Sequence, residues 1–411
     1  MSGNLPTGSV AVTGLGLCTP AGLTVAENWT TVCAGRSTAR PDPALAGLPV
    51  NFSCRIPDFD ATALLGRAVS WRLDRFVQIA LVAARQAIAH AGLDPAGWDG
   101  DRVGVVVGNS LGGTDTFERQ HRVLLAEGER MVSPLTIPAA MVNMVAGHLA
   151  IDCGARGPSL VTATACASGT TALGLARDLL LAGRCDVVVA GGTESAVTPS
   201  TMAALSRMGA LSRRVDAPEL ACRPFDVERD GFVAAEAAGF LVLERTDHAT
   251  ARGAPVLAGL SGFGASSDAH HATAPDPSGV GVERAIRDAL ADAGLAPRDI
   301  AHINAHGTST PLNDVTEARV IHRVFGDGPV VTSTKGVTGH PLAAAGAIEA
   351  AYVVLALRNG TVPPVANLTK QDPAIEIDLA RDVPRRLPIA AALSTSLGFG
   401  GHNAALVFTA A

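Results

Sequence analysis

The sequence is poor in several residue types, and each shortage narrows what the protein can be. Aromatic residues make up only 4% of the 411 residues, although 47% are apolar, so alanine and glycine supply much of the bulk. This composition favours closely packed helices and sheets over a wide aromatic-lined barrel. The formal net charge of −6 gives no reason to expect nucleic-acid binding. Lysine occurs only at Lys335 and Lys370, so a lysine inside a motif is notable.

The spacing of the cysteines and the apolar runs exclude further classes of protein. Seven cysteines are scattered with no Cys-x-x-Cys pair, which indicates neither a disulfide framework nor a zinc site. Residues 1–8 show no basic and apolar pattern of a signal peptide. The longest apolar stretch, 342–357, is interrupted by Glu349 and is short for a membrane span. We therefore expect a cytoplasmic protein that does not enter a membrane.

The stretch from Thr162 to Thr171 is typical of a strand-to-helix elbow with a cysteine at its centre. An apolar run ending at Val161 precedes it, and an alanine- and leucine-rich helical pattern over 172–182 follows. Backbone N–H groups and the positive end of a helix dipole favour the thiolate of Cys166, and the turn directs the sulfur toward a substrate. A small buried cysteine that only packs is the alternative, and this stretch alone does not separate the two.

Strand and helix patterns alternate in both halves of the chain. Apolar runs at 103–107 and 186–190 lead into glycine-rich turns and indicate a parallel sheet, and helical spacing over 72–91 predicts a helix that stops at Gly92. Residues 256–264 repeat the strand and Gly-x-Gly pattern of 10–16. We interpret this as an internal duplication, which predicts an α/β fold of two halves, 1–252 and 253–411.

Two histidines and a lysine follow predicted strands in the second half of the chain. His306 lies in Asn-Ala-His-Gly-Thr-Ser-Thr, and Lys335 and His340 share the segment Lys-Gly-Val-Thr-Gly-His. Because ligands bind beyond the carboxyl ends of parallel strands, these residues, Cys166 and Phe399 are expected to meet in one cleft. A lone histidine at a strand end is more often a satisfied structural residue. A thiolate with two imidazoles and an ammonium, however, is suited to acyl transfer from a thioester and to stabilising an enolate.

Eight short motifs occur in a fixed order between Val10 and Phe408. They are Val12-Thr-Gly-Leu-Gly16, Thr164-Ala-Cys-Ala-Ser-Gly169, Ala190-Gly-Gly-Thr-Glu194, Arg223-Pro-Phe-Asp-x3-Asp-Gly-Phe232, Ser267-Asp-Ala-His270, Asn304-Ala-His-Gly-Thr-Ser-Thr310, Thr334-Lys-Gly-Val-Thr-Gly-His340 and Gly398-Phe-Gly-Gly401. This set resembles that of the β-ketoacyl-acyl-carrier-protein synthases of the thiolase superfamily. The resemblance implies a thiolase-like duplicated fold, in which two βα-layered halves give a five-layered α-β-α-β-α architecture.

The resemblance also implies a set of site residues. Cys166 resembles the acyl-accepting nucleophile, and His306 and His340 resemble the pair that drives decarboxylative condensation. Lys335 resembles the supporting lysine and Glu349 the carboxylate that accompanies it. Phe399 resembles a gating aromatic, and its N–H with that of Cys166 resembles an oxyanion hole. The expected substrate contacts are Thr308 and Thr310 for the phosphopantetheine arm, Leu111 for the acyl pocket, Asp268 and His270 in a mobile loop, and Gly398 and Gly400 in the gating loop.

The implied reaction extends an acyl chain held on Cys166 by two carbons from malonyl-acyl carrier protein, with loss of carbon dioxide. It implies no metal, nucleotide or redox cofactor. The implied partners are an acyl carrier protein and a second subunit, in either a homodimer or a heterodimer with a chain-length factor. A chain-length factor itself is an unfavoured alternative, since it lacks the cysteine. A thiolase or a chalcone-synthase-like enzyme would not carry these two histidine motifs, and a cysteine hydrolase has no supporting Cys-His-Asn pattern.

Departures from the family pattern leave the pathway open. Ala235-Glu-Ala-Ala-Gly239 replaces the usual Gly-Glu-Gly-Ala-Gly, Gly336 replaces a common serine, and Thr395-Ser-Leu397 replaces Asn-Ser-Phe. The cysteine elbow and the loop at 267–270 resemble fatty-acid elongating enzymes. The arginine-rich, lysine-poor composition and the altered pocket positions favour a secondary pathway. We therefore interpret the chain as a ketosynthase of type II polyketide synthesis, with primary fatty-acid elongation as the alternative.

Overall fold

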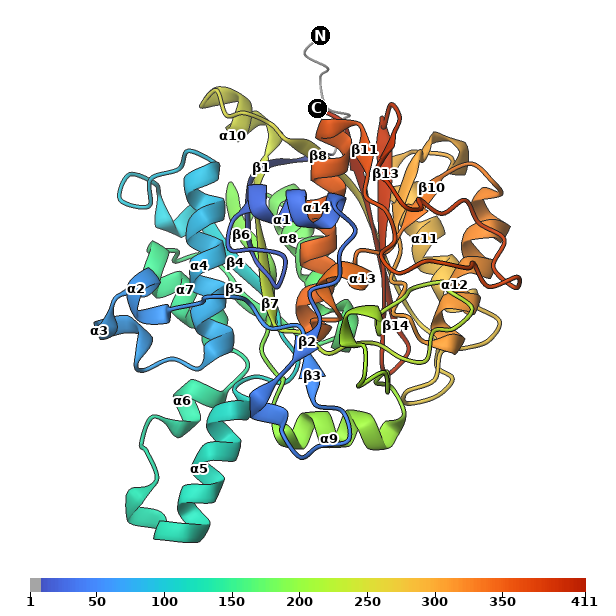
Figure 1. Ribbon diagram of the computed structural model, residues 1–411. Coiled ribbons are helices and arrows are strands. Elements are labelled where there is room, and N and C mark those ends of the chain that lie inside the picture. Colours follow the sequence, from blue (N-terminus) through green and yellow to red (C-terminus); the bar gives the residue numbers. More distant parts are fainter. Residues whose placement is uncertain (1–8) are drawn as a thin grey trace.

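The computed structural model describes residues 9–411 as two five-stranded sheets joined edge to edge (Figure 1). The strand order is β10-β9-β13-β14-β8-β1-β7-β6-β4-β5. The two halves meet where β1 and β8 pair antiparallel, from Val10 opposite Leu260 to Val12 opposite Ala258. The segment 1–8, in which a signal peptide was sought, lies outside the described residues.

The two sheets have the same internal topology. One contains β1 (Val10–Cys18), β7 (Ala237–Arg245), β6 (Val187–Glu194), β4 (Val103–Gly108) and β5 (Ser159–Thr162). The other contains β8 (Ala258–Ser267), β14 (His402–Thr409), β13 (Ala391–Gly398), β9 (His302–Asn304) and β10 (Val330–Thr332). In each sheet the first two pairings are antiparallel and the last two parallel, so the expected parallel sheet is in fact mixed. The matching order supports the duplication, and the boundary near residue 252 stays a prediction.

The helices form three layers around these sheets, which gives the predicted five-layered architecture. Two central helices, α8 (Ser168–Leu181) and α14 (Ala345–Asn359), share one buried apolar cluster with strands of both sheets. A second cluster joins α4 (Arg75–His90) and α7 (Met144–Cys153) to the outer face of the first sheet. A third joins α11 (Val280–Ala293) and α12 (Pro311–Phe325) to the outer face of the second sheet. Each sheet is therefore covered on both faces.

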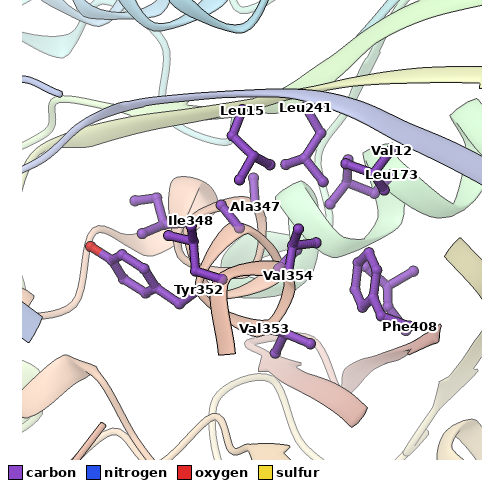
Figure 2. Packing of buried hydrophobic residues seen from close by; sticks show 14 of the residues in the cluster. Val12, Leu15, Leu173, Leu241, Ala347, Ile348, Tyr352, Val353, Val354 and Phe408 are labelled. Atoms are coloured by element: carbon purple, nitrogen blue, oxygen red, sulfur yellow. The ribbon is translucent and has the colours of Figure 1, made fainter. Parts of the chain in front are cut away.

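The apolar helix α14 is the centre of the molecule. Figure 2 shows its residues Ala347, Ile348 and Val354 among side chains from β1, β7, α8 and β14. The continuous helical stretch Leu342–Asn359 is long and apolar enough to cross a membrane, so our argument from its length was wrong. However, 83% of it is buried inside the protein, which identifies it as a core helix. The cytoplasmic location stays a prediction.

Paired glycines let one helix in each half approach its strand closely. A Cβ on Gly14 would lie 2.1 Å from the carbonyl oxygen of Ala87 in α4. At the equivalent place, a Cβ on Gly262 would lie 2.1 Å from the carbonyl oxygen of Ala289 in α11. These glycines lie inside β1 and β8, so neither of them ends its strand. In each half, the missing side chain instead lets a helix pack closely against the strand.

The remaining elements surround this frame. They are α1 (Val25–Cys33), β2 (Arg40–Pro41), β3 (Phe52–Ser53), α2 (Ala61–Leu65), α3 (Arg67–Ser70), α5 (Thr114–Glu127), α6 (Thr136–Ala140), α9 (Pro199–Met208), α10 (Thr246–Ala251), α13 (Lys335–Thr338), β11 (Thr361–Val362) and β12 (Arg385–Arg386). In Figure 1, α5 and α6 project away from the layered body. The loops that follow β5, β9, β10 and β13 converge between the halves, and the site described next lies there.

Candidate active site

Cys166 lies in a strained elbow between β5 and the central helix α8. It sits in a 3₁₀ turn, Ala165–Ala167, and the preceding Ala165 has φ = +49°, a left-handed conformation that is unfavourable for alanine. The Ser168 hydroxyl accepts from the Thr164 N–H at 2.9 Å and donates to the Ala165 carbonyl at 2.6 Å. These bonds hold the strained turn, and the predicted elbow is confirmed.

Two histidines from different loops converge on the cysteine sulfur. His340, which follows α13, places its Nε2 atom 3.2 Å from the Sγ atom of Cys166. His306, which follows β9, stacks edge to face on His340 with ring centroids 5.4 Å apart. Phe232 packs against the other side of His340, with centroids 5.0 Å apart. Sequence motifs separated by more than a hundred residues thus form one compact cluster.

A buried lysine supports His306 from behind. The Nζ atom of Lys335 donates to the His306 carbonyl oxygen at 2.6 Å and lies 3.3 Å from its Nδ1 atom. The same ammonium is paired with Glu349 of α14. An ammonium group can only donate hydrogen bonds, so the His306 Nδ1 atom must accept the hydrogen bond from Lys335. The proton of the neutral ring is therefore assigned to Nε2. Lys335 therefore fixes the tautomer in which His306 presents an N–H to the cleft.

Burial determines the resting charge of these groups. It lowers the pKa of both His306 and His340 well below the ordinary value, and the Lys335 charge lowers both further, so the imidazoles are neutral. Burial also raises the pKa of the Cys166 thiol to about 11, although Lys335 and the N–H of Phe399 act in the opposite direction. The prediction of a favoured thiolate is therefore wrong for the resting site, because desolvation outweighs the elbow's donors. Cys166 is therefore a thiol in the resting site, and the Nε2 atom of His340 lies within hydrogen-bond distance of its sulfur.

The alkylation rate of Cys166 should report this raised pKa. Because only the thiolate reacts, we expect the iodoacetamide rate to rise about tenfold per pH unit between about pH 7 and pH 9. Peptide mass spectrometry would follow Cys166 alone, and a Cys33→Ser variant controls for the half-exposed Cys33. A rate that levels off below about pH 8 would show instead a stabilised thiolate.

Two supporting residues were missed in the sequence. Glu317, buried in α12, accepts the N–H groups of His306 and Gly307 at 2.7 and 2.8 Å, which fixes the loop that carries His306. The hydroxyl of Thr395 donates to the same carboxylate at 2.7 Å. Burial raises the pKa of Glu317, while these donors and Lys335 lower it. The available signal was a glutamate at helical spacing from the apolar residues Val320, Ile321 and Val324.

A cavity of about 390 Å³ leads to the cluster. Of the residues expected to contact substrate, Thr308, Thr310, Asp268 and Gly398 line it. Phe399, the expected gating residue, lines it as well. Three others do not line it in the described chain, namely Leu111, His270 and Gly400, and their roles stay predictions.

The loop 398–401, which we predict to act as a gate, packs tightly against the cysteine elbow and is hydrogen-bonded to the loop at 268–276. A Cβ on Gly398 would lie 2.5 Å from the Thr164 carbonyl oxygen, so only glycine fits there. Gly400 donates its N–H to the Ala272 carbonyl at 2.8 Å, and Asn403 donates to the Asp268 carboxylate at 2.7 Å. Movement of one loop is therefore expected to move the other.

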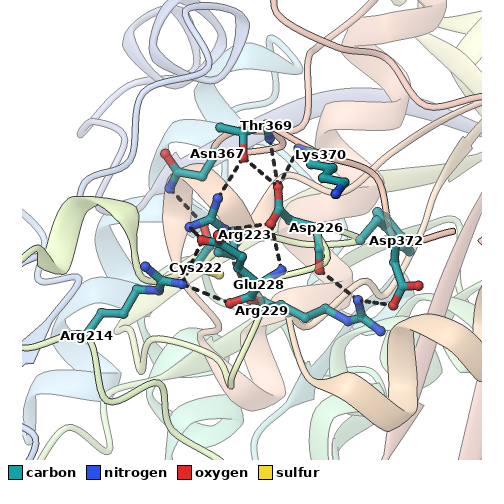
Figure 3. A network of polar contacts seen from close by, with 12 residues as sticks. Arg214, Cys222, Arg223, Asp226, Glu228, Arg229, Asn367, Thr369, Lys370 and Asp372 are labelled. Carbon is teal, nitrogen blue, oxygen red and sulfur yellow. Dashed lines mark hydrogen bonds and ion pairs between the residues drawn. The ribbon is translucent and has the colours of Figure 1, made fainter.

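The motif at 223–232 lies at the centre of a network of polar contacts, which Figure 3 shows. The buried carboxylate of Asp226 accepts the N–H groups of Thr369 and Lys370 at 2.8 and 2.9 Å. Although burial acts to raise it, backbone donors hold the pKa of Asp226 below its usual value. Arg229 reaches the carbonyl oxygen of Thr310 and the Asp372 carboxylate. This network connects the loop at 367–372 to the wall of the cavity that contains Thr308 and Thr310.

A strained cysteine elbow, two neutral histidines and a buried lysine, placed between two duplicated βα halves, define a thiolase-like condensing enzyme. Residues 7–249 match the family model "Beta-ketoacyl synthase, N-terminal domain", and residues 257–369 match "Beta-ketoacyl synthase, C-terminal domain". The chain belongs to the β-ketoacyl synthase family and is an acyltransferase of the 3-oxoacyl-acyl-carrier-protein synthase type.

Relatives of known identity match over nearly the whole chain. A 3-oxoacyl-[acyl-carrier-protein] synthase 2 of Synechocystis sp. is 43% identical, covering 98% of this chain and 99% of that protein. The ishigamide ketosynthase/chain length factor is 32% identical with a TM-score of 0.92, covering 98% of this chain and 99% of that one. A type II polyketide ketosynthase, solved with its acyl-carrier protein and bound to the hexaketide, is 32% identical with a TM-score of 0.89, over 98% and 99%.

Proposed function

We propose that this chain elongates acyl chains in fatty-acid synthesis by decarboxylative condensation on Cys166. The 43% identity to a 3-oxoacyl-[acyl-carrier-protein] synthase 2 carries this proposal. The ishigamide ketosynthase/chain length factor and the type II polyketide ketosynthase named above are each 32% identical. The comparisons thus favour our alternative over type II polyketide synthesis. The lysine-poor composition that suggested the secondary pathway is a property of the whole chain and does not concern the pocket.

The first half-reaction loads an acyl chain from its carrier protein. The Cys166 thiol gives its proton to the Nε2 atom of His340, 3.2 Å away, as the sulfur attacks the thioester carbonyl. The N–H groups of Cys166 and Phe399 stabilise the oxyanion of the tetrahedral intermediate. The bond to the phosphopantetheine sulfur then breaks, and that sulfur takes the proton from His340. Thr308 and Thr310, which line the cavity, position the arm.

The second half-reaction forms the carbon–carbon bond. The malonyl carboxylate leaves as carbon dioxide, and its electron pair forms an enolate whose oxygen accepts the Nε2–H of His306. In the acyl-enzyme the sulfur has no proton to give, so His340 in its Nε2–H form supplies a second donor. The enolate carbon attacks the acyl carbonyl, the bond to Cys166 breaks, and the Cys166 thiolate takes a proton from solvent, because loss of carbon dioxide from the carboxylate supplies none. A neutral imidazole suits this step, because it can donate a hydrogen bond to the enolate oxygen without placing a further charge in the buried site.

Product analysis with defined primers distinguishes the two pathways. The purified chain would be supplied with malonyl-acyl carrier protein and a series of saturated acyl carrier proteins, and products would be read by mass spectrometry. We expect each accepted saturated primer to be extended once, to its β-ketoacyl product. Rejection of the saturated primers, with repeated extension of an unreduced β-keto chain, would favour the polyketide function instead.

We further propose that the chain forms a homodimer through the edge of β5. This strand ends the sheet order and pairs only with β4 among the described residues, and Leu160 on it is exposed. Large apolar side chains on the neighbouring helices are also exposed: Phe117, Leu125, Ile137 and Ile151. An unpaired apolar edge of this kind is normally covered by a second chain. Leu111 is exposed on the same half, so its place in an acyl pocket depends on that partner.

Solution mass measurement tests this surface. By light scattering we expect the chain alone to have twice its 41.7 kDa mass, and an Ile137→Lys variant to be shifted toward the monomer. Arg298→Lys, on the exposed loop before β9, serves as the control. A stable monomer that assembles only with a chain-length factor would favour the heterodimer.

A further inference from the structure

The structure assigns a second property to the catalytic cluster, which is reversible, inhibitory binding of a thiophilic divalent cation such as Zn²⁺. The ligands are the Sγ atom of Cys166 and one ring nitrogen each of His306 and His340. Such an ion is an inhibitor of the enzyme and no part of its reaction. This inference concerns binding, so it does not depend on which acyl chain the enzyme accepts.

The donor atoms are already close to a metal-binding arrangement. All three lie within 4.8 Å of one another, on side chains that are buried and held by their neighbours. Around a tetrahedral zinc ion, bond lengths of about 2.0–2.3 Å separate such donors by about 3.4–3.6 Å. The sulfur and the Nε2 atom of His340 are already 3.2 Å apart. A shift of about 1 Å by the third donor, within reach of a histidine ring rotation, completes the set.

The chemistry of the set and the shape of the cavity favour zinc over hard cations. A thiolate with two imidazoles suits Zn²⁺, whereas Mg²⁺ and Ca²⁺ prefer oxygen ligands. Binding forms one S–Zn and two N–Zn bonds and releases two protons to solvent. One is the thiol proton of Cys166, and the other is the Nε2 proton of His306, whose Nδ1 atom then takes a proton from Lys335. The cavity of about 390 Å³ leaves the fourth position to a water molecule and gives the ion a path of entry. The ion would occupy the sulfur that must accept the acyl chain.

The surroundings of the ligands explain why this is an inhibitory site and not a resident one. A metal-bound histidine normally donates its second N–H to a carboxylate or carbonyl. The His340 Nδ1 atom has no hydrogen-bond partner within the described residues, and the His306 Nδ1 atom faces the Lys335 ammonium. That ammonium also repels a cation. Three good ligands without supporting acceptors predict an ion that a chelator removes readily.

Cobalt substitution gives a direct readout of the ligands. The full-length protein, reduced and free of added metal, would be titrated with Co²⁺ and then with Zn²⁺. We expect a thiolate-to-cobalt charge-transfer band and the intense visible bands of a four-coordinate ion, both removed by equimolar Zn²⁺. Cys166→Ala should abolish the charge-transfer band. Loss of a residue that only hydrogen-bonds a metal ligand typically weakens metal affinity by about 10–100-fold. His306→Ala and His340→Ala, which remove a ligand itself, should each weaken Co²⁺ affinity by more than this. Cys33→Ser and His322→Ala, outside the cluster, should leave the spectra unchanged.

Competition with acyl loading completes the test. Saturating Zn²⁺ should block both acylation and alkylation of Cys166, excess chelator should restore them, and protein acylated beforehand should show no charge-transfer band. These results would support the site even if the preferred chain differs from our proposal. Cobalt bands that survive in Cys166→Ala, or no bands in the folded wild-type protein, would overturn the inference.

Discussion

Replacement of Cys166 by alanine is expected to lower β-ketoacyl product formation by at least about 10⁴-fold, the scale of loss when a catalytic nucleophile is removed. No acyl-enzyme should be detectable. The substitution removes one buried sulfur from a 6%-exposed position and leaves the elbow's hydrogen bonds in place, so the fold should be retained. Product formation by a carrier-protein assay and intact mass would measure both effects. Cys33→Ala is the matched control.

The same variant should separate the two half-reactions. His306, Lys335 and the enolate site do not depend on the sulfur, so Cys166→Ala should still release carbon dioxide from malonyl-acyl carrier protein. The double variant with His306→Ala should lose that activity, because the fixed Nε2–H donor is gone. Release of carbon dioxide from the double variant at the rate of the single one would contradict the role of His306.

Removing the Lys335 ammonium is expected to cause the largest loss of stability. Lys335→Met leaves Glu349 buried without its partner, which typically costs about 3–5 kcal/mol in the free energy of unfolding. The double variant Lys335→Met with Glu349→Leu should recover the part of this free energy that comes from the unpaired carboxylate. A loss of about 1–3 kcal/mol should remain, because the His306 carbonyl still lacks its donor. Both variants should lose condensation, since the tautomer of His306 is no longer fixed. Denaturant unfolding provides the measurement, and Lys370→Met, at the exposed second lysine, is the control.

The loss in Lys335→Met should also depend on pH. Burial raises the pKa of Glu349 to about 7 even with Lys335 beside it, and removing the lysine raises that pKa further. A carboxyl whose folded pKa is raised loses stability as pH increases from its unfolded value toward its folded value. The variant should therefore be less destabilised at about pH 5.5 than at about pH 8. An equal loss of stability at both pH values would mean that Glu349 is solvated in the variant.

The motif-bearing loops could be predicted because each motif encodes a local structure. The elbow at Cys166 and the strand ends at His306 and Lys335 follow from apolar runs that stop at small residues, and parallel strands bring such ends together. The repeat of Gly14 and Gly262 revealed the duplication, although its cause is helix contact within the strands. Residue spacing alone does not distinguish a glycine that turns the chain from one that admits a helix.

Two features of the site could not be predicted because they depend on tertiary surroundings. The elbow favours a thiolate locally, but burial by loops distant in sequence raises the Cys166 pKa to about 11. Glu317 acts on His306 only through backbone N–H groups, so its side chain belongs to no motif.

The role of Cys166 as the acyl acceptor is tested most directly by loading the protein with an acyl chain. The wild-type protein would be incubated with a single acyl-acyl carrier protein in the absence of the malonyl substrate, and its intact mass and peptide map would be recorded. We expect one added acyl group, located on Cys166, that disappears when malonyl-acyl carrier protein is supplied. An unmodified protein, or an acyl group on another residue, would contradict it.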